Sequence, residues 1–407
     1  MCLVLAGGHA LVDGVAVRCD VSIADGAVIS VGRACEGGER CDASGLVIVP
    51  GLHNGHMHAA TSLLQGMPRT GTLDSWVSSL WRFECGITPK EAYWGSLYAA
   101  CRMLLSGITS FEDLHFFQGE VAKACTEAGI RATLSEALMD RQPWRAPSSV
   151  SSSLALGRAV RNEPLLTAKM GIVSVRMASE ALIDEAVEAY ASHEGLFSGY
   201  HLHMDEVPAD RVHSMDAYGC SPTDFFFNKG VLSPGTTVAH CVHPSPHDIS
   251  VLASSGARIA HCPGSNLGLR SGTAPVGAFL AAEATLCLGI DSPSICDGYD
   301  LWRDYRLVSL LHGVAPRSVL PLMAGTAGVH PGMPADLVFL DRSAFFPHRD
   351  AAGSLVLAAS PADVRHVMVG GRFVVRDRTV CTLDADRVQE RALEAADGVW
   401  SRLEASE

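Results

Sequence analysis

Short apolar runs separated by turn residues occupy both ends of the chain. The first fifty residues hold five such runs, at 3–5, 10–12, 21–23, 27–31 and 46–49. Similar runs return after residue 330, at 335–340, 364–369 and 373–375. Because the two ends share this texture, we predict that residues 1–50 and 330–385 pair into one small β-sandwich domain. Apolar residues at helical spacing then predict a C-terminal helix over 386–407.

Between these ends the pattern alternates apolar strands with amphipathic helices. A capping box at Thr88-Pro89-Lys90-Glu91 begins one helix, and Gly107 ends it before the next strand. The unit recurs, with strand ends at His58, His115, Leu138, Met177, His203, His240, His261 and Asp291. Eight successive units predict an α/β fold, a closed (β/α)8 barrel of the TIM type over residues 51–329. The active sites of such barrels lie at the C-terminal ends of the strands.

Histidines and an aspartate at these strand ends are candidate metal ligands. His56 and His58 are two residues apart on the first strand, so their side chains point to the same side. His203 ends the fifth strand, and Asp291 ends the eighth. Three imidazole nitrogens and one carboxylate suit zinc, or alternatively ferrous iron, with one coordination position left for water. The sequence therefore predicts one divalent ion.

Three further residues are candidates for catalysis or substrate binding. Glu206 follows His203 by three residues and is expected in the loop after the fifth strand. His240 ends the sixth strand beside the predicted ion, which favours catalysis over a purely structural role. For His261, at the end of the seventh strand, a substrate-binding role and a core role both stay open.

Five motifs, in this order, resemble the metal-dependent amidohydrolase superfamily, in the branch of cytosine, guanine and S-adenosylhomocysteine deaminases and triazine chlorohydrolases. They are Pro50-Gly51-Leu52-x-Asn54-x-His56-x-His58, His203-x-x-Glu206, Ala239-His240-Cys241-Val242-His243, His261-Cys262-Pro263-x-Ser265-Asn266 and Gly289-x-Asp291. The resemblance spans almost the whole chain. It implies that the ion is held by His56, His58, His203 and Asp291. It also implies that Glu206 and His240 are catalytic, together with Asp291.

The resemblance implies hydrolytic deamination of an aminated nitrogen heterocycle, such as a purine, pyrimidine, pterin or triazine, with release of ammonia. Hydrolysis of another C–N or C–Cl bond in the same site is the alternative. A non-catalytic scaffold is the alternative of another class, and the complete set of ligands disfavours it. The end of the fourth strand, Arg176-Met177-Ala178, offers no lysine, which favours one ion over a lysine-bridged pair. The loop 292–298 departs from the small-residue loop of relatives, so the substrate does not follow.

The segment after the first strand, 59–86, is expected to enclose a small planar substrate. Its aromatic side chains suit a ring face, and its polar side chains could contact the edge of the ring. The candidate substrate-binding residues are Gln65, Trp81 and Glu84, together with His261.

Charge and composition narrow the partners and the compartment. A formal charge of −13 and the lack of a Lys/Arg-rich run disfavour nucleic acid and anionic membranes. No apolar run reaches the length of a membrane span, about 18 to 20 residues. The thirteen cysteines are scattered, and the start Met1-Cys2-Leu3 lacks a basic leader, so we expect reduced thiols and a cytoplasmic protein. We expect a small-molecule substrate and a homo-oligomer.

Overall fold

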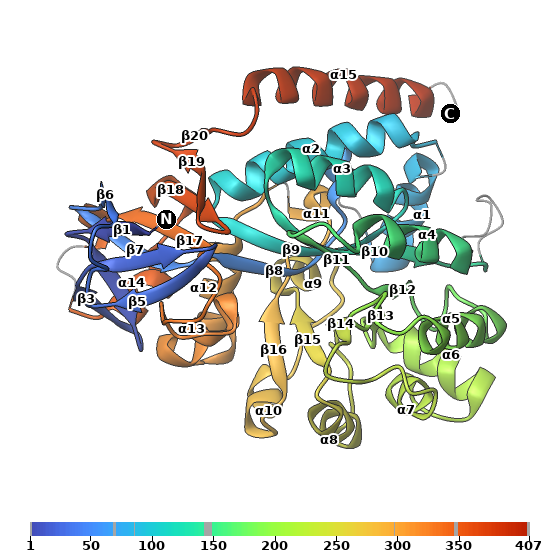
Figure 1. Cartoon of the computed structure of the whole chain (residues 1–407). Coiled ribbons are helices and arrows are strands. Elements are labelled where there is room, and N and C mark those ends of the chain that lie inside the picture. The colour runs from blue at the N-terminus through green and yellow to red at the C-terminus, as the bar shows by residue number, and fades with distance from the viewer. Residues whose placement is uncertain are drawn as a thin grey trace.

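A computed structural model describes residues 2–67, 71–84, 86–141, 149–296, 298–345 and 349–404 (Figure 1). Its centre is a parallel sheet in which eight strands close into a barrel, with β9 paired to both β8 and β10. The strands are β8 (Leu52–Met57), β9 (Ile108–His115), β10 (Arg131–Leu138), β12 (Met170–Ile172), β13 (Tyr200–Met204), β14 (Thr237–His240), β15 (Arg258–His261) and β16 (Thr285–Leu288). The predicted (β/α)8 barrel is confirmed.

Helices follow the barrel strands and pack around them (Figure 1). They are α2 (Pro89–Leu105), α3 (Gln118–Ala128), α4 (Val150–Val160), α5 (Glu180–Ser192), α6 (Pro208–Tyr218), α7 (Pro222–Asn228), α8 (Pro246–Ser255), α10 (Val276–Ala281), α12 (Leu301–His312) and α13 (Pro316–Ala324). The predicted capping box begins α2. Thr88 Oγ1 accepts a hydrogen bond from the backbone N of Glu91 at 3.3 Å, and Glu91 Oε2 accepts one from Thr88 N at 2.8 Å.

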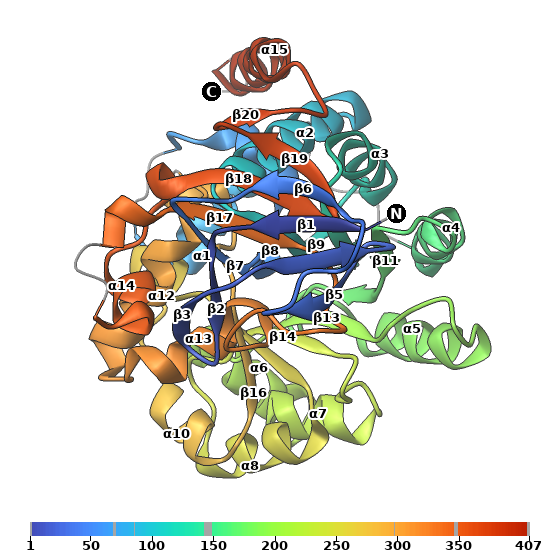
Figure 2. The same cartoon turned by 60° about the vertical axis from the view of Figure 1, so that its left-hand side comes forward.

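Strands from the two ends of the chain lie in the same sheet (Figure 2). In the seven-stranded sheet, β7 (Leu46–Pro50) pairs antiparallel with β17 (Leu337–Asp341), beside β2 (His9–Val12), β3 (Val15–Arg18), β18 (Val364–Val369), β19 (Arg372–Arg376) and β20 (Thr379–Val380). A four-stranded sheet holds β1 (Leu3–Ala6), β4 (Val21–Ala24), β5 (Ala27–Val31) and β6 (Glu39–Asp42). Buried side chains from both sheets, including Leu5, Ile48 and Phe339, form one core.

The predicted pairing of the two chain ends is thus confirmed, and so is the C-terminal helix, α15 (Ala385–Glu404), which lies along α2 (Figure 1). Strands β3 and β6 were not predicted; their residues are mostly exposed, and β6 has no apolar run. The division of the chain into a sandwich domain, a barrel and a terminal helix stays a prediction.

The fourth barrel strand is shorter than predicted. We expected it to continue to Met177, but β12 ends at Ile172, and a turn follows in which Ser174 O accepts hydrogen bonds from the backbone N of Met177 and of Ala178. A short strand, β11 (Leu166–Ala168), also pairs with β10 and was not predicted. The turn moves Arg176 and Met177 out of the sheet and into the wall of a cavity.

Four remaining elements follow barrel strands: η1 (Ala59–Leu64), α1 (Leu73–Glu84), α9 (Pro263–Gly268) and α11 (Pro293–Cys296). Three others lie between β17 and β18: η2 (Arg342–Phe345), α14 (Ala351–Leu357) and η3 (Pro361–Asp363). Among the described residues, none of the helices combines the length and the hydropathy that a membrane span requires.

The reduced state expected for all cysteines is wrong for one pair, because Cys2 and Cys35 form a disulfide. The parallel pairing of β1 with β6 brings the two segments that carry these residues together. Ten other cysteines in the described part of the chain are free thiols.

Candidate active site

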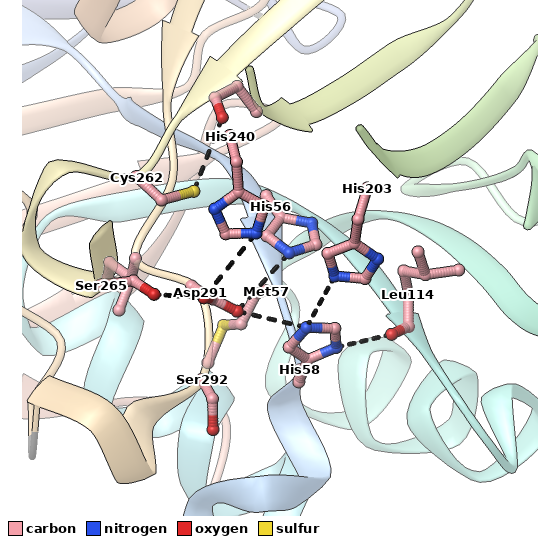
Figure 3. Close-up of polar contacts among 12 residues, drawn as sticks. His56, Met57, His58, Leu114, His203, His240, Cys262, Ser265, Asp291 and Ser292 are labelled. Carbon is pink, nitrogen blue, oxygen red and sulfur yellow. Dashed lines mark hydrogen bonds and ion pairs between the residues drawn. The ribbon is translucent and has the colours of Figure 1, made fainter. Parts of the chain in front are cut away.

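The four predicted ligands meet at the C-terminal mouth of the barrel (Figure 3). Asp291 Oδ1 lies 3.5 Å from His56 Nε2 and 3.2 Å from His58 Nε2. The Nε2 atoms of His58 and His203 are 3.3 Å apart. One nitrogen from each of the three histidines lies within 4.8 Å of the others. This donor set of three imidazoles and one carboxylate fits a divalent cation.

Backbone carbonyls accept hydrogen bonds from Nδ1 of His58 and of His203, the ring nitrogen that points away from the centre of the site. His58 Nδ1 donates a hydrogen bond to Leu114 O at 2.6 Å, and His203 Nδ1 donates one to Val173 O at 2.7 Å. These bonds place the proton on Nδ1, so each Nε2 presents a lone pair to the centre of the site. Such a hydrogen bond behind a ligating imidazole is the usual support of a metal ligand.

His56 is held by a second histidine instead of a carbonyl. Its Nδ1 lies 2.9 Å from His201 Nε2, and His201 Nδ1 lies 3.4 Å from Ser135 Oγ. The buried Nε2 of His56 has no hydrogen-bond partner among the described residues, as expected for a ligand atom without its ion. Burial lowers the pKa of His56 to about 4, so the ring is neutral and can bind a cation.

Asp291 is ionised although it is buried. Burial alone would raise its pKa, but the neighbouring imidazoles of His56, His58 and His240 hold the pKa of Asp291 well below its usual range. Ser265 Oγ also donates to Asp291 Oδ2 at 2.5 Å. The carboxylate therefore carries its negative charge where a cation would lie.

Left-handed backbone occurs at several strand ends of the site. The φ angles are +49° at Asp205, +74° at His240, +46° at Cys241 and +66° at Asp291. Residues other than glycine rarely adopt this conformation, and it costs about 1 to 3 kcal/mol each. At His240 the left-handed turn ends strand β14, and the His240 ring points to the site (Figure 3).

Glu206 and His240 lie next to the cluster. His240 Nε2 is 3.6 Å from Glu206 Oε2 and 3.9 Å from Asp291 Oδ2, and His240 Nδ1 donates to Asn266 Oδ1 at 3.0 Å. Burial, reinforced by the charge of Asp291 and opposed by His240, raises the pKa of Glu206 to about 7. A carboxyl group with this pKa can both donate and accept a proton near neutral pH.

A cavity opens above these residues. Its apolar wall comes largely from α1 and from the ends of β9 and β10, with Leu73, Trp76, Val77, Leu80, Trp81, Leu114, Phe116 and Met139. Its polar part holds His58, His203, Glu206, His240 and Asp291 at one end, and Asp74, Arg176 and Asp210 elsewhere in the lining. Polar groups thus line only part of the cavity.

Of the four candidate substrate-binding residues, Trp81 lines the cavity. Gln65 follows η1 and is half-buried, but neither it nor His261 is among the described residues of the cavity wall. The side chain of Glu84 lies outside the described part of the chain. The His261 ring packs against that of His312, with centroids 5.4 Å apart. A substrate-binding role for His261 stays a prediction.

Comparison with known proteins places this site in a family. A sequence model described as the amidohydrolase family matches residues 47–321. The chain belongs to the amidohydrolase family. It is 34% identical to a 5-methylthioadenosine/S-adenosylhomocysteine deaminase of Natronomonas pharaonis over 99% of both chains. It is 31% identical to a 5'-deoxyadenosine deaminase of Methanosarcina mazei, over 94% of each.

Solved structures share the fold of this amidohydrolase. An adenosine deaminase from Xanthomonas campestris with bound zinc superposes with a TM-score of 0.91 at 21% identity, over 98% of both chains. A zinc complex of atrazine chlorohydrolase from Arthrobacter aurescens gives a TM-score of 0.87 at 20% identity, over 97% of this chain and 100% of the other. At these identities the likeness is one of fold.

Several residues of the amidohydrolase site were not assigned from the sequence. Ser265 and Asn266 belong to a motif quoted above, and its spacing after His261 was the available signal. Arg176 was noted only because no lysine stands in that segment, and no role was assigned to it. Asp74 and Asp210 carry no motif, and only the folded chain brings them to the cavity.

Proposed function

We propose that this amidohydrolase is a metal-dependent deaminase that hydrolyses the exocyclic amine of an adenine-type nucleoside. The observation that carries the proposal is the convergence of His56, His58, His203 and Asp291 with Glu206 and His240 in one buried mouth. Relatives at 34% and 31% identity, named as deaminases of 5-methylthioadenosine, S-adenosylhomocysteine and 5'-deoxyadenosine, support the substrate class.

We assign one divalent ion to the three histidines and Asp291. Zinc is the first choice, because the donor set is borderline-soft and a structural neighbour is described with bound zinc, and ferrous iron is the alternative. A bound ion would supply a Lewis acid that brings the pKa of water toward neutrality.

The chain's own groups then move the protons. The carboxylate of Asp291 accepts a proton from the attacking water, and His240, whose Nδ1 proton is held by Asn266 Oδ1, presents the lone pair of Nε2 to the same water. Glu206 protonates the ring nitrogen, takes up the proton that Asp291 accepted from the water, and passes it to the leaving amine. The remaining hydroxyl proton then returns to Glu206 as the carbonyl forms. The C–N bond to the amine breaks, a C–O bond replaces it, and ammonia leaves.

The apolar wall binds the ring and the rest of the nucleoside. Trp81, with its neighbour Trp76, presents aromatic surface on α1. We retain Glu84, at the end of α1, as the candidate acceptor for substrate hydroxyl or amino groups. A homo-oligomer in the cytoplasm stays part of the proposal.

An ammonia-release screen tests the function. Purified protein loaded with zinc is offered adenosine, 5'-deoxyadenosine, 5-methylthioadenosine and S-adenosylhomocysteine, alongside cytosine, guanine and a chlorotriazine. We expect ammonia from the adenine nucleosides. Turnover of the chlorotriazine alone would favour the C–Cl alternative. No turnover of any compound by metal-loaded protein would favour the non-catalytic scaffold.

A further inference from the structure

Arg176 lies in the cavity wall between two carboxylates from different elements. Its Nη2 lies 3.0 Å from Asp74 Oδ1, on α1, and its Nη1 lies 3.5 Å from Asp210 Oδ1, on α6. The Arg176 side chain is 23% exposed, and that of Asp210 is 9% exposed. The planar fork of a guanidinium can contact two carboxylates at once, which the single ammonium of a lysine does less well.

Asp210 connects this ion pair to the loop that carries Glu206. Its Oδ2 accepts hydrogen bonds from the backbone N of Glu206 at 2.8 Å and of Val207 at 3.3 Å. It thereby satisfies free N–H groups at the start of α6 and fixes the backbone of the proposed proton donor. The neighbouring charge of Arg176 stabilises Asp210 in its ionised, accepting form.

Asp74 connects the guanidinium of Arg176 to helix α1, which forms much of the apolar wall of the cavity. It belongs to the first turn of α1, and the next two turns supply Trp76, Val77, Leu80 and Trp81 to the wall. The position of this wall relative to the barrel therefore depends in part on the contact between Asp74 and Arg176.

We propose that Arg176 is a positioning residue that holds the roof helix α1 through Asp74 and the Glu206 loop through Asp210. The positions of the substrate ring and of the proton donor Glu206 then both depend on the guanidinium of Arg176. This inference rests on the proposed function for its kinetic consequences, but not for the two contacts themselves. Two carboxylates already offset the charge of Arg176, which disfavours a direct role in binding a substrate anion.

Kinetics of the zinc-loaded protein on its preferred substrate distinguish the contact of Arg176 with Asp74 from its contact with Asp210. Asp74→Asn should raise KM by about two- to five-fold and leave kcat nearly unchanged. This change in KM corresponds to the small interaction energy of a partly exposed ion pair. Asp210→Asn should lower kcat by roughly ten-fold or more, because misplacing a catalytic group is costly, with little change in KM. Arg176→Met should do both, and Arg176→Lys should recover part of the loss.

The chain offers a matched control. Asp184 on α5 pairs with Lys229 at 2.6 Å and is 56% exposed, close to the 60% of Asp74, but it does not line the cavity. Asp184→Asn should leave kcat and KM at the parent values. A change in the control equal to that in Asp74→Asn would overturn the proposal, since any lost surface pair would then have the same effect.

Amide hydrogen exchange tests the contacts without any substrate. Asp74→Asn and Arg176→Met should speed exchange in α1, over 74–82, and Asp210→Asn and Arg176→Met should speed it at Glu206 and Val207. Asp184→Asn should change neither. Exchange and kinetics at parent level in the Asp74 and Asp210 variants would overturn the proposal. A loss in Arg176→Met confined to S-adenosylhomocysteine, which bears a carboxylate, would overturn it in favour of direct substrate binding.

The two hypotheses fail differently. If the parent releases no ammonia from any heterocycle, the proposed function fails while the exchange experiment still decides the role of Arg176. If the parent deaminates a nucleoside and the variants behave like the control, the positioning role fails alone.

Discussion

Glu206 and Asp291 are buried carboxyl groups around one cavity whose pKa values are shifted in opposite directions. Burial raises the pKa of Glu206 to about 7, whereas the neighbouring imidazoles of His56, His58 and His240 overcome the effect of burial and lower the pKa of Asp291. Two acids with separated pKa values can serve as a proton donor and as an ionised ligand at the same pH. The division of roles in the proposed mechanism follows from these surroundings.

At Glu206, removing the proton donor should leave the metal bound. Glu206→Gln is expected to keep the zinc content of the parent and to lose at least roughly a hundred-fold in kcat. Elemental analysis and steady-state kinetics on the same preparation check both halves. Near-parent turnover would contradict the assigned role.

The raised pKa of Glu206 also predicts a pH-dependent stability change in metal-free protein. Ionising this carboxyl costs more in the folded than in the unfolded chain, so the cost is absent below its usual pKa and fully present above about 7. Glu206→Gln should match the parent near about pH 4 and exceed its unfolding free energy by up to about 3 kcal/mol near about pH 8. Denaturant unfolding at both pH values measures this. An equal difference at the two pH values would contradict it.

Removal of one imidazole should abolish metal binding. His203→Ala leaves two histidines and Asp291, and we expect its zinc content and kcat to fall by at least roughly ten-fold. His247→Ala is the control, because His247 is exposed and pairs with Asp224 away from the site. Full zinc content in His203→Ala would remove His203 from the ligand set.

At the scale of elements, regular features were predictable and irregular ones were not. The Thr88 capping box and the period of the apolar runs identify α2 and the barrel strands from local chemistry alone. The turn after Ile172 and the left-handed backbone at His240 depend on contacts with distant segments, which a local pattern does not record.

The helix α1 ends at a residue whose role was predicted from the sequence, Glu84. Our hypothesis is that the Glu84 carboxylate accepts hydrogen bonds from substrate hydroxyl or amino groups. Glu84→Ala should raise KM or shift the preference among adenine nucleosides, with zinc content unchanged. Parent kinetics on every accepted substrate would assign Glu84 to the surface.

For the whole molecule, the site depends on segments from one end of the chain to the other. The metal ligands span residues 56 to 291, and the C-terminal helix α15 supports the segment that follows the first two of them. Trp400 Nε1 donates to Leu63 O at 3.1 Å, and Arg402 Nη2 donates to Glu91 Oε1 at 2.8 Å. The barrel strands, helix α1 and the terminal helix α15 therefore all contribute to the position of the metal ligands.

An ion bound to this group should stabilise the entire fold. His56 and Asp291 are buried at 0% and 4% exposure and meet only in the closed barrel, so the unfolded chain offers no comparable site. A ligand that binds only the folded state at a hundred times its Kd adds about 3 kcal/mol. Chelation should thus lower the thermal midpoint by several degrees, and added zinc should restore it. His203→Ala should show neither change. Equal midpoints for chelated and zinc-loaded parent protein would contradict a site shared by β8, β13 and β16.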